Sequence, residues 1–92
     1  MQKPVSTDAL RIDKWLWHAR FCKTRDIAQE KAESGRIRIN GNRVEKSSYS
    51  VRVGDVMTLP SGGKVVALRV LALGERRGPA SEARTLYEEI PE

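Results

Sequence analysis

The chain has 92 residues, with 17 lysines and arginines against 12 aspartates and glutamates, for a formal net charge of +5. This length supports one compact domain with a small core, which leaves little room for a catalytic cleft. The positive charge favours a polyanionic partner such as nucleic acid.

Cys22 is the only cysteine and His18 the only histidine. An internal disulfide is therefore excluded, and a zinc site built from Cys and His is hard to assemble. No apolar run approaches the ~20 residues of a membrane helix, and residues 1–10 lack the apolar stretch of a signal peptide. We expect a cytoplasmic protein without metal or cofactor.

Residues 1–8 contain Pro4 and no apolar period, which indicates a flexible lead. A helical period follows, and the apolar residues that share one face are Ile12, Trp15, Leu16 and Ala19. The opposite side carries Lys14, Trp17, His18 and Phe21, with Arg11 and Arg20 on the edges. This pattern predicts a helix with a buried face and a partly basic outer face.

A second helix is predicted from Arg25 to about Ser34. Thr24 is a suitable N-cap, and Gly35 ends the helix because glycine tolerates the left-handed conformation. The side chains expected to face the core are Ile27, Ala28 and Ala32.

Strands are predicted after the second helix. Residues 36–39 alternate arginine and isoleucine, the period of a half-buried strand, and Asn40 with Gly41 suits a tight turn into a return strand at 43–44. Further elements are strands at 56–59 and 64–73 and a short C-terminal helix within 81–89. We therefore predict an α+β fold, with two N-terminal helices packed on a small, mostly antiparallel sheet. The predicted domain spans 9–73 and the tail 74–92.

The basic residues of the first half could form one surface. They are Arg11, Lys14, Arg20, Lys23, Arg25, Arg36 and Arg38. Neutralising several phosphates releases counterions and supplies sequence-independent affinity. Thr24 stands between two cations at a helix N-terminus, where free amides suit a phosphate, although Thr24 could equally be only a cap.

Other candidates have alternative roles. Trp17 could stack on an unpaired base or pack against the lead or the tail. His18, if protonated, could approach a phosphate, but a surface or packing histidine is the more common case. Gln29 and Asn40 could bond to bases or sugars, or serve a helix surface and a turn. Asp13 is expected to pair with Arg11, Arg20 or a backbone amide.

An enzyme is disfavoured because no nucleophile with a histidine and acid partner, phosphate loop or metal-ligand spacing is evident. Two other classes remain open. The same cations would suit an interaction module that binds an acidic protein partner, or a DNA-binding regulator.

Four segments together resemble a known family. They are Arg-Ile-Asp-Lys-Trp-Leu-Trp-His-Ala-Arg at 11–20, Lys-Thr-Arg at 23–25, Glu-Ser-Gly-Arg-Ile-Arg-Ile-Asn-Gly at 33–41 and Val-Gly-Asp at 53–55. The pattern resembles the S4-type RNA-binding domain over residues 9–70. Its first ten residues look like the small ribosome-associated heat-shock proteins within that group.

The resemblance implies two helices on a small sheet, with structured RNA bound across the helices and the first strand. The contacts it implies are Arg11, Lys14, Arg20, Lys23, Thr24, Arg25, Gln29, Arg36, Arg38 and Asn40. The core it implies contains Ile12, Leu16, Ile27, Ile37 and Ile39. Lys31 stands where the pattern has an apolar residue, so its side chain should snorkel or the helix should shift.

The function implied is recognition of free large ribosomal subunits that still hold a nascent chain on tRNA, as an aid to recycling. Ribosomal or transfer RNA is then the expected partner. We expect a monomer.

Overall fold

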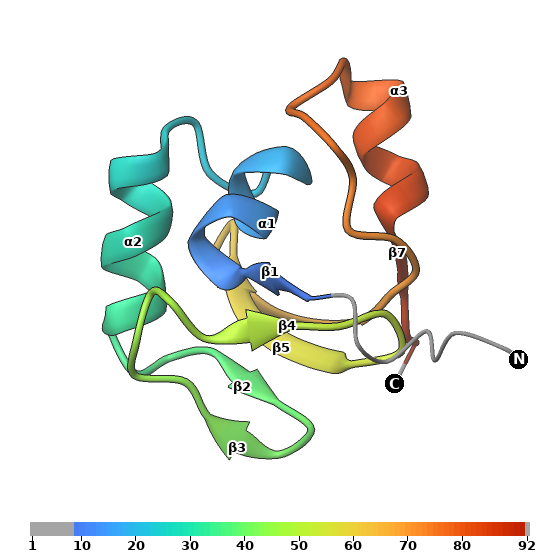
Figure 1. Ribbon diagram of the computed structural model, residues 1–92. Coiled ribbons are helices and arrows are strands. Elements are labelled where there is room, and N and C mark those ends of the chain that lie inside the picture. The colour runs from blue at the N-terminus through green and yellow to red at the C-terminus, as the bar shows by residue number, and fades with distance from the viewer. Residues whose placement is uncertain (1–8, 92) are drawn as a thin grey trace, which may run out of the picture.

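The computed structural model describes residues 9–91, and the predicted lead at 1–8 lies outside them. Helices α1 (Ile12–His18) and α2 (Arg25–Glu33) lie over an antiparallel sheet (Figure 1). A short helix, α3 (Ala80–Ala83), follows near the C-terminus. The predicted α+β class is confirmed.

The main sheet has the order β3-β2-β5-β6-β7, and every neighbouring pair is antiparallel. Its strands are β2 (Arg38–Ile39), β3 (Asn42–Arg43), β5 (Val56–Ser61), β6 (Lys64–Val70) and β7 (Tyr87–Glu89). A separate pair joins β1 (Leu10–Arg11) to β4 (Ser50–Val51). Neither β1 nor β4 was predicted, because two residues are too few to show an alternation.

The predicted turn between β2 and β3 is confirmed. Asn40 and Gly41 have φ angles of 54° and 85°, both positive as a tight hairpin turn requires. The amide of Val44 donates to the carbonyl of Ile37 at 2.8 Å, so the pairing continues beyond the two short strands. The isoleucines of this segment therefore enter the core, and Arg38 faces the other side of the sheet.

The core lies between the helices and the sheet. Its largest fully buried side chains include Ile12, Trp15, Leu16, Ile37, Ile39, Met57, Leu59 and Leu68. The predicted buried face of α1 is confirmed, Trp15 included. On α2, Ala28 and Ala32 are buried, but the prediction for Ile27 was wrong, since 43% of it is exposed. The alanines are four positions apart and define the contact face, from which Ile27 is rotated by about 100°.

The helix predicted within 81–89 is shorter than expected. Only α3 is α-helical, a 3-10 turn follows at Arg84–Leu86, and the chain then enters β7. The edge of β6 supplies unpaired backbone groups that β7 satisfies, which propensity within this segment does not reveal. Leu86, only 5% exposed, packs into the core.

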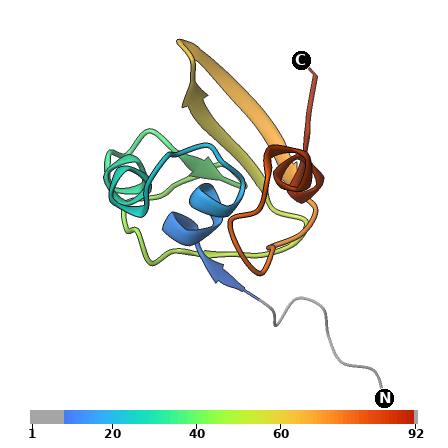
Figure 2. The same ribbon diagram turned by 90° about the horizontal axis from the view of Figure 1, so that it is seen from above.

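Residues 71–79, called the strap below, cross the side of α1 away from α2 (Figure 2). The indole N–H of Trp15 donates to the carbonyl of Ala72 at 2.9 Å, and Nδ1 of His18 lies 3.3 Å from the carbonyl oxygen of Leu73. His18 is consequently buried, with 1% exposed. Its predicted outward position was wrong because a segment 55 residues away covers it.

Phe21 was also predicted to face outward, and it is half-buried instead. Its ring lies 6.2 Å from that of Trp15 and 4.9 Å from that of Tyr87, measured between centroids. The aromatic group thus joins α1 to β7, a contact between segments far apart in the chain.

Replacing Trp15 by Phe should destabilise the fold and loosen the strap, because the carbonyl of Ala72 loses its donor and a void forms beside it. We expect a loss of about 1–3 kcal/mol in urea denaturation, together with faster hydrogen exchange across residues 71–79. Trp17→Phe is the control, since the Trp17 indole makes no hydrogen bond to residues 9–91. Equal stability of the two variants would contradict this role for Trp15.

Candidate RNA-binding surface

Asp13 joins three elements at the first turn of α1. It is only 3% exposed. Arg11 of β1 donates to both of its carboxylate oxygens, at 3.2 and 3.0 Å, and Arg25 of α2 donates to one of them at 3.3 Å. The pairing with Arg11 was predicted, whereas Arg25 was not among the expected partners. Both arginine side chains remain about half exposed, at 53% and 43%, so each keeps donors that face solvent.

The start of α2 has the predicted cap. Thr24 is extended, with φ −134° and ψ 162°, and its hydroxyl accepts a hydrogen bond from the amide of Ile27 at 3.1 Å. Lys23 and Arg25 are exposed on either side of it. The helix N-terminus adds a partial positive charge to these cations.

The outer side of α1 carries Lys14 and Trp17, three positions apart and both half-buried. The Trp17 ring contacts His18 at 5.8 Å between centroids, and the guanidinium of Arg77 lies 6.0 Å from its centroid. One of the two alternatives for Trp17, packing against the tail, is therefore present in the structure.

Arg20 lies just beyond the C-terminus of α1 and has a left-handed backbone, with φ 64°. Its Nε donates to the carbonyl of Gly78 at 2.7 Å. This predicted RNA contact therefore also ties the turn between the helices to the strap.

The strand arginines are placed apart from this group. Arg38 lies on the open face of the sheet, directly opposite Arg43 in register. Like charges opposed in this way repel each other. Glu45 relieves Arg43 through an ion pair at 3.1 Å, whereas Arg38 makes no ion pair within residues 9–91.

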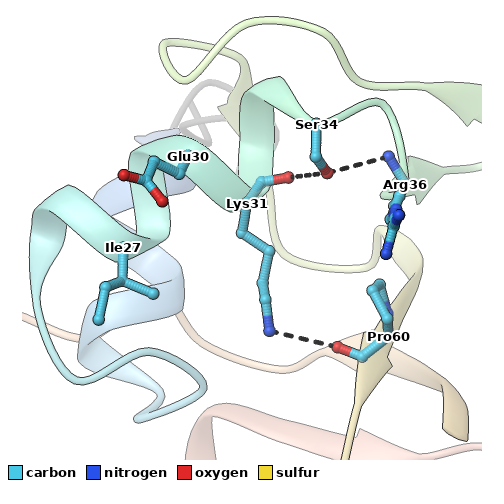
Figure 3. Close-up of a pocket in the computed structure, with 6 residues that line it drawn as sticks. All are labelled: Ile27, Glu30, Lys31, Ser34, Arg36 and Pro60. Carbon is cyan, nitrogen blue, oxygen red and sulfur yellow. Dashed lines mark hydrogen bonds between the residues drawn. The ribbon is translucent and has the colours of Figure 1, made fainter. Parts of the chain in front are cut away.

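Arg36 follows the C-terminal end of α2, where its amide donates to the hydroxyl of Ser34 at 3.3 Å. Lys31 reaches across a hollow beside it, and its ammonium lies 3.5 Å from the carbonyl of Pro60 (Figure 3). The side chain of Lys31 thus snorkels, which was one of the two alternatives predicted for it. The hollow is lined by Ile27, Glu30, Lys31, Ser34, Arg36 and Pro60.

The amide of Asn40 has a structural role. Its Nδ2 donates to Asp55 at 3.1 Å, and its Oδ1 accepts from the amide of Val56 at 3.0 Å. Gln29 is exposed on α2 and makes no hydrogen bond through its side chain within the described part of the chain. The predicted set therefore does not form one patch: Arg11 and Arg25 meet at Asp13, Arg38 lies on the open face of the sheet, and Asn40 is already engaged by the fold.

Sequence reasoning missed two cations beside the predicted ones. Arg43 could have been found, because a two-residue turn at Asn40 and Gly41 places it opposite Arg38. No sequence pattern indicated a role for Arg77, because only the folded strap brings it next to Trp17. A second hollow, also missed, is lined by Asn40, Tyr49, Ser50, Arg52 and Asp55.

No three His, Cys, Asp or Glu side chains converge as a metal site requires within residues 9–91. Burial raises the pKa of the Cys22 thiol, against a smaller opposing effect of Lys31, so the thiol stays protonated at neutral pH. None of the helices in the described part of the chain is long and apolar enough to cross a membrane.

Two helices on an antiparallel sheet, with cations gathered at the helix starts, are the features of an S4-type RNA-binding fold. The chain belongs to the S4 domain family, whose sequence model matches residues 10–57. The resemblance found in the sequence is thereby confirmed.

Individual relatives agree with this assignment. The chain is 47% identical over 83 residues to heat shock protein 15 of Escherichia coli (strain K12), covering 90% of this chain and 62% of that protein. It is 39% identical over 83 residues to the RQC P-site tRNA stabilizing factor of Bacillus subtilis (strain 168), covering 90% and 94%. A solved trimeric structure of Vibrio cholerae heat shock protein 15 superposes with a TM-score of 0.84 at 40% identity, covering 90% of this chain and 83% of that one.

Removing the charge of Asp13 tests its role as the link between the helices. Asp13→Asn should lower the free energy of unfolding by about 1–3 kcal/mol, because two partly buried guanidinium groups lose their counter-charge. Chemical denaturation measures this loss. Asp26→Asn is the matched control, an exposed carboxylate at the start of α2, and a comparable loss there would contradict a special role for Asp13.

The single histidine should make stability depend on pH. Burial lowers the pKa of His18 below its ordinary value near 6.5, Lys14 and Arg25 lower it further, and the bond to Leu73 opposes them. The unfolded chain therefore takes up a proton that the folded chain resists, so stability is complete above about pH 6.5 and decreases below it. Thermal melts from pH 7.5 to 5 measure this dependence. His18→Asn, which keeps a donor but does not titrate, should show a shallower decrease.

Proposed function

We propose that this chain binds structured RNA of the large ribosomal subunit, ribosomal or transfer RNA, through the cations at the starts of α1 and α2. The observation that carries the proposal is the grouping around Asp13, in which Arg11 and Arg25 are held together while each keeps exposed donors. Arginines fixed in this way offer bidentate contacts to phosphate without the entropic cost of ordering free side chains.

Lys23 and Thr24 extend this group at the N-terminus of α2. The hydroxyl oxygen of Thr24 accepts the amide of Ile27, so its O–H remains a possible donor. The helix dipole favours an anion at this end of the helix. Phosphate groups of a folded RNA strand therefore suit the edge of the molecule where α1 and α2 begin. Contacts of this kind set position and orientation, while shape and 2′-hydroxyls distinguish RNA from DNA.

The name of one relative supports a setting with tRNA. One is called a P-site tRNA stabilizing factor and another a heat shock protein. By analogy, we propose that the chain acts in recycling of large subunits that carry a nascent chain on tRNA. The role is binding rather than catalysis, and the proposed location is the cytoplasm. The chain spans 62% of the length of the Escherichia coli relative, so the relative has sequence without a counterpart here.

We also propose that the chain works as a monomer, with 9–73 as the RNA-binding domain. A relative has been solved as a trimer, so sedimentation equilibrium of the free protein is the direct test. A stable trimer at micromolar concentration would overturn the monomer.

The main test combines three substitutions in the two helices and the turn between them, Lys14→Ala, Lys23→Ala and Arg25→Ala. The variant should bind purified large ribosomal subunits about 100-fold more weakly, because three charge-assisted contacts are lost. Co-sedimentation with separated large and small subunits measures the binding and shows which subunit is recognised.

The matched control replaces three exposed cations elsewhere, Lys64, Arg69 and Arg84, by alanine. Both variants change the net charge by the same amount, so general electrostatics affects them alike. Circular dichroism checks that each is folded. Unchanged binding by the first variant, or equal weakening of both, would refute the proposed surface. Complexes that persist after nuclease treatment would instead indicate a protein partner.

A further inference from the structure

Arg77 of the strap is a cation that lies outside the residues matched by the S4 family. Its guanidinium lies 6.0 Å from the centroid of the Trp17 ring, within the range of a cation–π contact. Its Nε is buried and has no hydrogen-bond partner within residues 9–91. An unpaired donor of this kind is unfavourable unless something else compensates for it.

Two other arginines near the C-terminal part of the fold are paired with acids. Arg76, the next residue in the strap, pairs with Glu82 at 3.0 Å, and Arg69 pairs with Glu88 at 3.2 Å. Arg77 makes no ion pair with any residue of 9–91. Its position is fixed by an aromatic ring rather than by a carboxylate, so its charge stays available to an external anion.

The strap holds Arg77 in a defined place relative to α1. The indole of Trp15 anchors the strap at Ala72, and Arg20 anchors it at Gly78, next to Arg77 in sequence. Figure 2 shows α1 lying between α2 on one side and the strap on the other. Lys14 and Trp17 occupy the outer side of α1. The three neighbouring segments α2, α1 and the strap therefore each carry a cation, namely Arg25, Lys14 and Arg77.

We propose that Arg77, held on Trp17, contacts an RNA phosphate, and that the RNA-binding surface extends from α2 across α1 onto the strap. This inference rests on the proposed function. Trp17 is then a positioning residue, whose ring supports a guanidinium rather than a base. A guanidinium stacked on a ring keeps donors at its edge, where they match two phosphate oxygens, and a lysine does not reproduce this arrangement.

The test uses the full chain, labelled at its N-terminus, and purified large ribosomal subunits at fixed magnesium. Arg77→Ala should weaken binding about tenfold and reduce the salt dependence by about one phosphate contact. Arg77→Lys should restore only part of the affinity. In a Trp17→Leu background, Arg77→Ala should have a smaller effect than in the original chain, because the arginine is no longer held in place.

Arg76→Ala is the matched control, since it removes the same charge one position away. It should weaken binding by less than twofold. Wild-type affinity in Arg77→Ala, while the Lys14, Lys23 and Arg25 variant still loses binding, would overturn this inference and leave the proposed function standing. Equal losses for Arg76→Ala and Arg77→Ala, or a full effect of Arg77→Ala without Trp17, would also overturn it.

Discussion

The buried carboxylate of Asp13 is the constraint on which the rest of the arrangement depends. A carboxylate removed from water needs charged or hydrogen-bonding partners, and here Arg11 and Arg25 supply them from two different elements. The same two contacts join β1 and α2 to the first turn of α1. The ion pairs that stabilise the helix pair therefore also determine where two exposed cations lie. A change that weakens the fold at this site would also displace the charges.

Elements encoded by neighbouring residues could be predicted from the sequence. The Thr24 cap, the end of α2 at Gly35 and the turn at Asn40 and Gly41 each depend on the conformational preferences of one or two residues. The alternation around Arg38 likewise identified the buried and open faces of β2. In all of these cases the deciding interactions lie within a few positions of each other.

Elements decided by distant residues could not be predicted. His18 and Phe21 are covered by the strap and β7, which no helical period near residue 20 reveals. Ile27 is exposed because the two alanines of α2 set the angle of helix packing. For the candidate site, the basic residues could be identified from the sequence, but which of them lie close together could not. Asp13 brings Arg11 and Arg25 together, whereas Arg38 lies on the far face of the sheet. The contact of Arg77 with Trp17 likewise joins residues far apart in the sequence and could not be predicted.

Strand β7 has a consequence for solubility. The seven-residue strand β6 would otherwise present a free edge, with Val65 70% exposed near one end, and such edges pair readily with other chains and aggregate. β7 covers part of this edge with only three residues, and its last two are glutamates, one of them paired with Arg69. The new outer edge is short and negatively charged, so it is a poor template for another strand. The acidic segment that contributes nothing evident to recognition of a polyanion thus covers a sheet edge that another strand could otherwise extend.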